Sequence, residues 1–85
     1  MSGYHITPIP RGVYGQASKI EEEFLEFKDA LLQSNKLMSL IELSDLIGAV
    51  EAYAENNGSS LSDLLIMLEA TKRAFNDGTR SNRDA

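Results

Sequence analysis

The sequence predicts an all-α protein: a small bundle of three to four helices that is completed by homo-oligomerisation. Three segments carry apolar residues at helical spacing, and each is bounded by residues typical of helix ends. No segment shows the alternating pattern of a strand. Because the chain has only 85 residues, we expect its small core to need support from a second subunit, a metal ion or both.

Composition excludes several classes of protein. The chain has no cysteine, which excludes disulfides and thiolate metal sites. Its formal net charge is −5, and its 8 lysines and arginines are scattered, so direct binding to nucleic acid is not expected. No apolar run approaches the length of a membrane span, and no apolar leader follows Met1. We therefore expect a cytoplasmic protein without membrane contact.

The chain divides into an arm, a helical domain and a tail. Residues 1–17 form an irregular arm, because Pro8 and Pro10 prevent a regular helix and Gly12 and Gly15 loosen the chain. Residues 18–78 form the helical domain, and residues 79–85 form a polar tail. The arm has apolar side chains that need a partner on the domain or on a neighbouring subunit; these are Tyr4, Ile6, Ile9, Val13 and Tyr14.

The first predicted helix runs from about residue 19 to residue 33. Ser18 and Glu21 have the spacing of a capping box, in which each side chain bonds the backbone N–H of the other residue. Ser34 and Asn35 end the helix. Its apolar residues form one stripe, which we expect to face the core; the stripe consists of Ile20, Phe24, Phe27 and Leu31.

Two further helices follow. The second begins near Asn35 or Ser39, which compete as caps, and ends at residues 57–58, an Asn-Gly pair. Because apolar residues surround this helix almost completely, we expect it to be buried on most sides. The third begins after the serine pair at 59–60 and ends near Gly78. Its apolar stripe consists of Leu61, Leu64, Leu68, Thr71 and Phe75.

Two acidic side chains lie in unusual places on the second helix. At about 100° per residue, one face is expected to meet solvent; it carries Ser44, Glu51 and Glu55. Glu42 points roughly opposite to this face, and Asp45 lies about 100° away from it. An ionised carboxylate that is buried there costs several kcal/mol unless it is paired or bound to a metal ion.

The first helix has a matching acidic group, which consists of Glu22, Glu23 and Glu26. Spacings of three and four residues place side chains on one helix face, so two neighbouring helices could direct four or five carboxylates at one point. The natural neutraliser is a hard divalent cation, Mg²⁺ or Mn²⁺. Two alternatives stay open: solvated surface charge, favoured most for Glu21, and a buried pairing of the second-helix acids with Lys72 or Arg73.

The acids form two short motifs. Residues 22–26 read E-E-x-x-E, and residues 42–45 read E-x-x-D. In this order and on these helices, the motifs resemble the signature of the MazG-like all-α nucleoside triphosphate pyrophosphohydrolases. That superfamily also includes dimeric dUTPases and phosphoribosyl-ATP pyrophosphohydrolases. The resemblance covers about residues 19–73, and compact proteins of this kind often come from bacteriophages.

The resemblance implies a Mg²⁺-dependent hydrolase. Water would attack the α-phosphorus of a nucleoside triphosphate and release a monophosphate and pyrophosphate. By position, the main metal ligands would be Glu23, Glu26, Glu42 and Asp45. Glu22 would bind a further metal ion or orient the attacking water. Such a metal cluster neutralises phosphate charge and polarises water.

Substrate contacts are expected from basic and aromatic residues. The candidates for phosphate binding are Lys19, Lys72, Arg73 and Arg80. Residues 72–73 resemble the basic segment that follows E-x-x-D in the family, although they also complement the end of their helix. Tyr53, Tyr14 and His5 could contact a base or sugar, but packing accounts for most aromatic residues. Because His5 is the one histidine of the chain, a His-rich metal site is excluded.

The chain is shorter than the folds that it resembles. These use four helices or complete their bundle across a dimer, so we expect a homodimer or a dimer of dimers. The arm could replace the missing element or wrap a partner subunit. Two other functions stay open: the same fold acting on phosphoribosyl-ATP, dUTP or a guanosine alarmone, and a non-catalytic acidic helical interaction protein. A protein that mimics DNA would need a regular row of exposed carboxylates, which the second helix does not offer.

Overall fold

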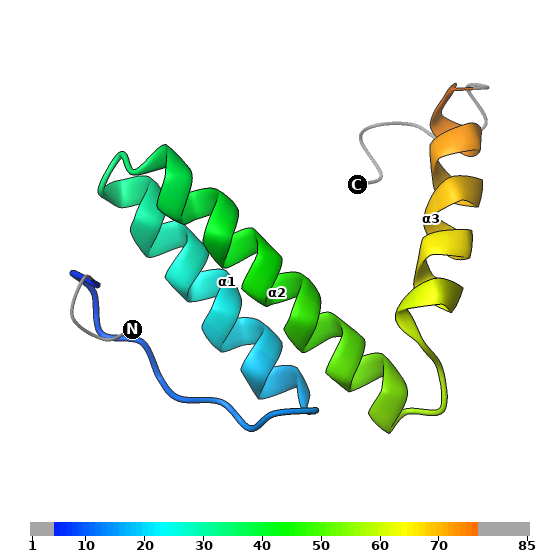
Figure 1. The fold of residues 1–85 in the computed structure, drawn as a ribbon, viewed down its shortest axis with the longest axis horizontal. Helices are drawn as coiled ribbons and strands as arrows, with labels where there is room; N and C mark the ends of the chain where they lie inside the picture. Colours follow the sequence, from blue (N-terminus) through cyan, green and yellow to red (C-terminus); the bar gives the residue numbers. More distant parts are fainter. Residues whose placement is uncertain (1–4, 77–85) are drawn as a thin grey trace.

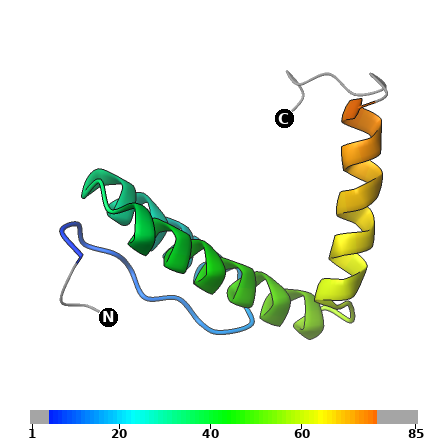
Figure 2. The same ribbon diagram turned by 45° about the horizontal axis from the view of Figure 1, so that its top comes forward.

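The computed structural model describes residues 5–76, which form three α-helices and no strand. The helices are α1 (Ala17–Leu32), α2 (Lys36–Asn56) and α3 (Leu61–Asn76). In Figure 1, α1 and α2 lie side by side and run antiparallel, whereas α3 leads away from this hairpin; Figure 2 shows the same arrangement after rotation. The predicted all-α class is confirmed. The predicted helix end at Gly78 and the tail at 79–85 lie outside the described residues, as do Tyr4 and Arg80.

Side-chain caps determine where two of the helices begin. The Oδ1 atom of Asn35 accepts a hydrogen bond from the backbone N–H of Met38 at 3.0 Å, so Asn35 rather than Ser39 caps α2. At α3, the hydroxyl of Ser60 accepts from the N–H of Asp63 at 3.1 Å. Asp63 also accepts from the hydroxyl of Ser59 at 3.0 Å.

The predicted capping box on α1 is wrong. The helix begins one residue earlier than Ser18, and its N-cap is Gln16, which forms no side-chain cap. Ser18 therefore lies inside the first turn, and its hydroxyl accepts from the N–H of Val13 at 3.0 Å. The arm occupies the serine hydroxyl that the capping box would have used.

Left-handed residues end the first two helices. Ser34 has φ 55° and Gly58 has φ 80°. After each of them, a backbone N–H reaches back five residues: Asn35 donates to Ala30 at 3.1 Å, and Ser59 donates to Ala54 at 2.8 Å. This is the geometry of a Schellman motif. Glycine adopts it without strain, whereas Ser34 does so against the preference of an L-residue.

The most deeply buried positions of the α1–α2 hairpin are unusual because they carry alanines and polar residues. The fully buried apolar residues are Ala30, Ala49, Ala52 and Ala54. The buried polar residues are Glu23, Asp29, Ser39 and Glu42. Small side chains let two helices approach closely, so few atoms separate the buried carboxylates of α1 from those of α2.

The predicted apolar faces are only partly buried in this chain. On α1, Phe24 and Leu31 of the stripe are 46% and 53% exposed. On α2, the expectation of burial on most sides is also wrong, since Leu37, Leu40 and Ile47 are exposed. α3 has no buried residue at all. The helix faces that carry Glu23, Ala30 and Glu42 pack together, which leaves many of the large apolar side chains exposed.

The arm lies along the outer side of α1 (Figure 1). At Gly12 the arm runs against α1, because an added Cβ would lie 2.2 Å from the carbonyl oxygen of Ser18. Any side chain at position 12 would therefore force the arm away from α1. None of the helices within residues 5–76 is long and apolar enough to cross a membrane.

Candidate metal centre

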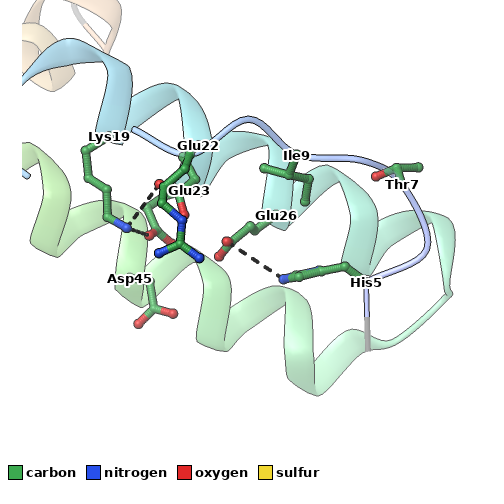
Figure 3. Close-up of a pocket in the computed structure, with 9 residues that line it drawn as sticks. His5, Thr7, Ile9, Lys19, Glu22, Glu23, Glu26 and Asp45 are labelled. Carbon is green, nitrogen blue, oxygen red and sulfur yellow. Dashed lines mark hydrogen bonds and ion pairs between the residues drawn. The ribbon is translucent and has the colours of Figure 1, made fainter. Parts of the chain in front are cut away.

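An open, polar pocket lies where the arm passes over α1 and the neighbouring turn of α2 (Figure 3). Among the described residues, two elements line it most: α1 and the arm. The lining residues are His5, Thr7, Ile9, Arg11, Lys19, Glu22, Glu23, Glu26 and Asp45. Glu42 lies directly beneath this set, because its carboxylate is within 4.8 Å of those of Glu23 and Asp45.

Glu42 is the most deeply buried acid, with 1% of its surface exposed. Its Oε1 atom has no hydrogen-bond partner among the described residues. Burial raises the pKa of Glu42, and the nearby charge of Asp45 raises this pKa further. An orphaned buried carboxylate oxygen normally costs free energy, and an ion, a water molecule or a proton would each reduce that cost.

Glu23 on α1 repeats this feature. It is 7% exposed, and its Oε1 atom also has no hydrogen-bond partner in the described part of the chain. Its Oε2 atom lies 3.1 Å from the ammonium of Lys19. One turn further along, burial raises the pKa of Glu26, and the charge of Glu23 adds to this rise. Two helices thus contribute acids that repel one another.

Glu22 has a different environment. Its Oε1 atom accepts from the N–H of Gly12 at 2.7 Å and from the ammonium of Lys19 at 3.2 Å. Burial raises the pKa of Glu22, but these two donors and the charges of Lys19 and Arg11 outweigh it, so the pKa is lowered overall. Glu22 is therefore ionised and held in place at the rim.

The structure brings all five acids of the two motifs together. Three overlapping groups have ligand atoms within 4.8 Å of one another: Glu22 with Glu23 and Glu26, Glu23 with Glu42 and Asp45, and His5 with Glu26 and Glu42. Asp45 is exposed within the single chain, whereas Glu23 and Glu42 are buried. Oxygen donors crowded in this way suit a hard divalent cation.

Of the basic candidates within residues 5–76, only Lys19 lines the pocket. Its ammonium lies between Glu22 and Glu23, at 3.2 Å and 3.1 Å. The hydrogen bond with Glu23 raises the pKa of Lys19 against the opposing effect of burial, and the bond with Glu22 adds to the rise. Lys19 and the neighbouring Arg11 supply fewer positive charges than the five acids supply negative ones.

The other substrate-binding candidates lie elsewhere in this chain. Lys72 and Arg73 are exposed on α3, and Lys72 pairs with Glu69 at 3.4 Å. They line no part of the pocket, and neither forms the buried pair with Glu42 or Asp45 that was the structural alternative. The reason is that α3 departs from the hairpin. Tyr53 is exposed on α2, outside the pocket lining, and Arg80 is outside the described residues.

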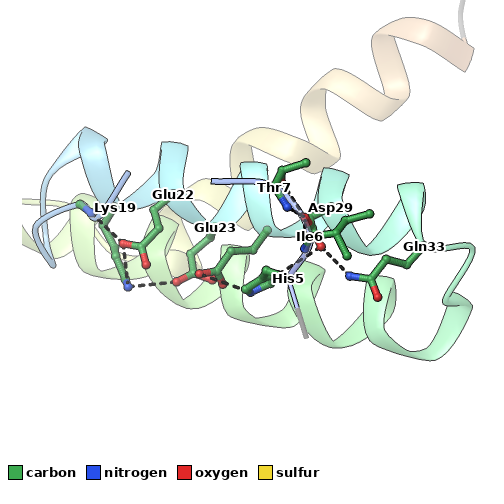
Figure 4. Close-up of polar contacts among 10 residues, drawn as sticks. His5, Ile6, Thr7, Lys19, Glu22, Glu23, Asp29 and Gln33 are labelled. Atoms are coloured by element: carbon green, nitrogen blue, oxygen red, sulfur yellow. Dashed lines mark hydrogen bonds and ion pairs between the residues drawn. The ribbon is translucent and has the colours of Figure 1, made fainter. Parts of the chain in front are cut away.

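The sequence pattern did not single out Thr7 and Arg11 of the arm, which line the pocket, or Asp29, which holds the arm. Asp29 on α1 is 1% exposed and anchors the arm (Figure 4). Its Oδ2 atom accepts from the N–H groups of Ile6 and Thr7 at 2.9 Å and 2.7 Å, and from the Thr7 hydroxyl at 2.6 Å. Its Oδ1 atom accepts from the Gln33 amide at 2.6 Å.

These donors determine the charge of Asp29. Burial raises its pKa, but the Thr7 hydroxyl, the Gln33 amide and the two backbone N–H groups outweigh burial and lower the pKa far below its usual range. A signal was present in the sequence: one face of the first helix carries a polar row at spacings of four, three and four residues. The row consists of Glu22, Glu26, Asp29 and Gln33.

Comparison of this chain with protein-family models, with curated proteins and with solved structures finds no match in any of the three. The function must therefore be inferred from the residues of the site and their geometry.

Proposed function

We propose that this protein is a Mg²⁺-dependent nucleoside triphosphate pyrophosphohydrolase of the MazG-like kind. One observation supports this most: Glu23 and Glu42 each hold a buried carboxylate oxygen without a hydrogen-bond partner among the described residues, and both belong to one acidic cluster. A stable fold pairs buried polar atoms unless a site requires them. A cation with oxygen ligands supplies the missing partner for both helices.

The donor set fits Mg²⁺ or Mn²⁺. Glu23, Glu26, Glu42 and Asp45 would hold the metal ions, since all four offer oxygen and lie in overlapping groups. When bound, such ions neutralise phosphate charge and polarise water. The surrounding acids also explain why the pocket could admit a polyanionic substrate only together with its cations.

Residues of the chain itself supply the remaining roles. Glu22 is ionised and immobilised by Gly12 and Lys19, so it can accept a hydrogen bond from water and orient it. Lys19 and Arg11 line the same pocket and offer positive charge to the phosphates at its rim. The geometry favours Arg11, which the sequence pattern did not single out, over the distant residues of α3.

We also propose that the working unit is a homodimer or a dimer of dimers. The chain exposes 6211 Å², about 1,200 Å² more than a compact monomer of its mass exposes. A standard interface buries about 800 Å² per partner. The radius of gyration is 15.0 Å, against about 12 Å for a compact chain of this length. A second copy covering α3 and the Phe24 face would bury the exposed apolar residues, and it could bring Lys72 and Arg73 to the site.

Product analysis tests the reaction. The protein is incubated with Mg²⁺ and each common NTP and dNTP in ¹⁸O-labelled water, and the products are resolved by ion exchange and mass spectrometry. We expect a monophosphate that carries the label, together with unlabelled pyrophosphate. Glu42→Gln should abolish this reaction. Glu51→Gln, an exposed acid on the same helix, should retain it and is the matched control.

Other outcomes redirect or overturn the proposal. Diphosphate and phosphate as products would indicate a different hydrolase. Turnover of only dUTP, phosphoribosyl-ATP or a guanosine alarmone would keep the chemistry and change the substrate. If Mg²⁺ bound but no nucleotide of this panel turned over, the non-catalytic helical interaction protein would become the better reading.

A further inference from the structure

The one histidine of the chain lies at the inner end of the acidic pocket. The Nε2 atom of His5 is 3.8 Å from Oε2 of Glu26, and the two side chains are 9% and 16% exposed. One ligand atom of His5 also lies within 4.8 Å of those of Glu26 and Glu42. Figure 3 shows the imidazole of His5 pointing along the pocket toward Glu26. The arm thus carries a nitrogen donor into a site whose other donors are all oxygen.

A second observation points to a ligand at this place. Glu42 is 1% exposed, and its Oε1 atom lacks a hydrogen-bond partner among the described residues. An unpartnered, buried carboxylate oxygen beside an imidazole is what a cation site contains before its ion arrives. The acidic cluster alone would not distinguish this position from a solvated group of charges.

The other side of the imidazole is already fixed. The Nδ1 atom of His5 lies 3.3 Å from Oδ1 of Asp29 (Figure 4). Asp29 is itself held by Ile6, Thr7 and Gln33, so its carboxylate cannot turn away. A carboxylate that accepts the proton of one ring nitrogen leaves the lone pair of the other nitrogen for a metal, which is the usual support of a metal-binding histidine.

From this geometry we propose that His5, Glu26 and Glu42 form a mixed nitrogen and oxygen position for a divalent transition-metal ion, with Asp29 as the residue that orients His5. The inference rests on the proposed function in one respect, namely that the acidic cluster binds metal ions. It adds a ligand from the arm and a preference among metals. Imidazole favours Zn²⁺, Ni²⁺ and Cu²⁺ over Mg²⁺, which prefers oxygen.

Metal bound by His5, Glu26 and Glu42 would join the arm to both α1 and α2. The arm would then be fastened over the pocket by the ion as well as by Asp29. Occupancy by a transition metal, but not by Mg²⁺ alone, would protect residues of the arm from proteolysis.

Nitrogen NMR of the histidine tests the proposal directly. Since the chain has 1 histidine, the two ring-nitrogen signals of the ¹⁵N-labelled full chain need no assignment beyond distinguishing Nδ1 from Nε2. At pH 8, addition of Zn²⁺ should shift the Nε2 signal to the metal-bound region while Nδ1 stays protonated. Mg²⁺ should leave both signals in place. Unchanged ring signals while calorimetry shows Zn²⁺ binding would overturn the proposal.

Calorimetry with variants separates ligation from anchoring. Loss of a residue that supports a metal ligand weakens binding by about 10–100-fold, so loss of the ligand itself in His5→Asn should weaken Zn²⁺ binding by about 10-fold or more. The affinity for Mg²⁺ should change much less. Thr7→Val is the matched control, because it removes one bond from the arm to Asp29 and keeps the imidazole. If Thr7→Val weakened Zn²⁺ binding as much as His5→Asn, the role of His5 would be anchoring only.

The two proposals can fail separately. Zn²⁺ on the imidazole without hydrolysis of any nucleotide would refute the proposed function and keep the metal position. Hydrolysis with Mg²⁺ but no response of the imidazole to Zn²⁺ would keep the proposed function and refute the metal position at His5. If calorimetry showed no binding of Zn²⁺ or Mg²⁺, both would be wrong.

Discussion

Replacing Glu42 by glutamine should stabilise the metal-free protein. The ligand atoms of Glu23, Glu42 and Asp45 lie within 4.8 Å of one another. Two unit charges at this distance repel by about 3.5 kcal/mol at an effective dielectric constant of about 20. Solvent around the exposed Asp45 and the nearby ammonium of Lys19 reduce this value. We therefore expect Glu42→Gln to raise the free energy of unfolding by about 1–3 kcal/mol in EDTA at pH 8.

The stability that Glu42→Gln gains over the natural protein should increase as the pH rises. The pKa of Glu42 is raised above its ordinary value of 4.5, so the folded state binds the proton more tightly than the unfolded state does. Stability of the natural protein therefore falls as the pH rises from 4.5 through the native pKa of this group. The advantage of the glutamine variant should be complete above that native pKa and should disappear at about pH 4 and below.

Thermal unfolding measures both effects. A change of 1 kcal/mol shifts the melting temperature of a domain of this size by about 4–8 °C, so the variant should melt at least about 4 °C higher in EDTA. Mg²⁺ at ten times its dissociation constant should stabilise the natural protein by about 1.4 kcal/mol and should not stabilise the variant. Glu51→Gln should change stability by less than about 0.5 kcal/mol. A Glu42→Gln variant that melted lower in EDTA and still gained from Mg²⁺ would refute the reasoning, because Glu42 would then be a structural partner.

Three further perturbations test other parts of the structure. Asp29→Asn should release the arm and lower the melting temperature at pH 7. Since the pKa of Asp29 is lowered from 3.8, its contribution is complete above that pH and is lost as the pH falls toward the native pKa; a deficit unchanged at pH 2 would contradict this. Asn35→Ala should cost about 1 kcal/mol through loss of the α2 cap, whereas an unchanged urea midpoint would show that the cap is dispensable. Ile66→Asp on α3, where Ile66 is 70% exposed, should shift the protein to monomer in sedimentation velocity; an unchanged assembly would place the interface elsewhere.

Local features could be read from the sequence because they depend on neighbours in the chain. The caps at Asn35 and Ser60 and the helix end at Gly58 follow from the side-chain oxygen or backbone freedom that each position needs. The unusual face of Glu42 follows from helical periodicity. The capping box at Ser18 failed because the arm, which no local rule places, uses that hydroxyl.

Which face of each helix is buried was predicted from the sequence less well than where the helices begin and end. Periodicity predicts which residues share a helix face, but it does not say which neighbour that face meets. The Phe24 stripe of α1 was expected to face the core, yet α1 packs on α2 through Glu23 and Ala30. The same limit applies to Lys72 and Arg73, whose distance from the acids depends on the direction in which α3 leaves the hairpin.

The sequence by itself determined the helical class, the positions of the three helices and the two acidic motifs, since these depend on residue type and spacing along one helix. Only the tertiary structure decided that the arm enters the site. The bonds from Ile6 and Thr7 to Asp29 join residues 23 and 22 positions apart, and they help to hold the arm where His5 meets Glu26 and Glu42. Contacts between distant segments depend on how the segments pack in three dimensions, which no periodic pattern in either segment contains.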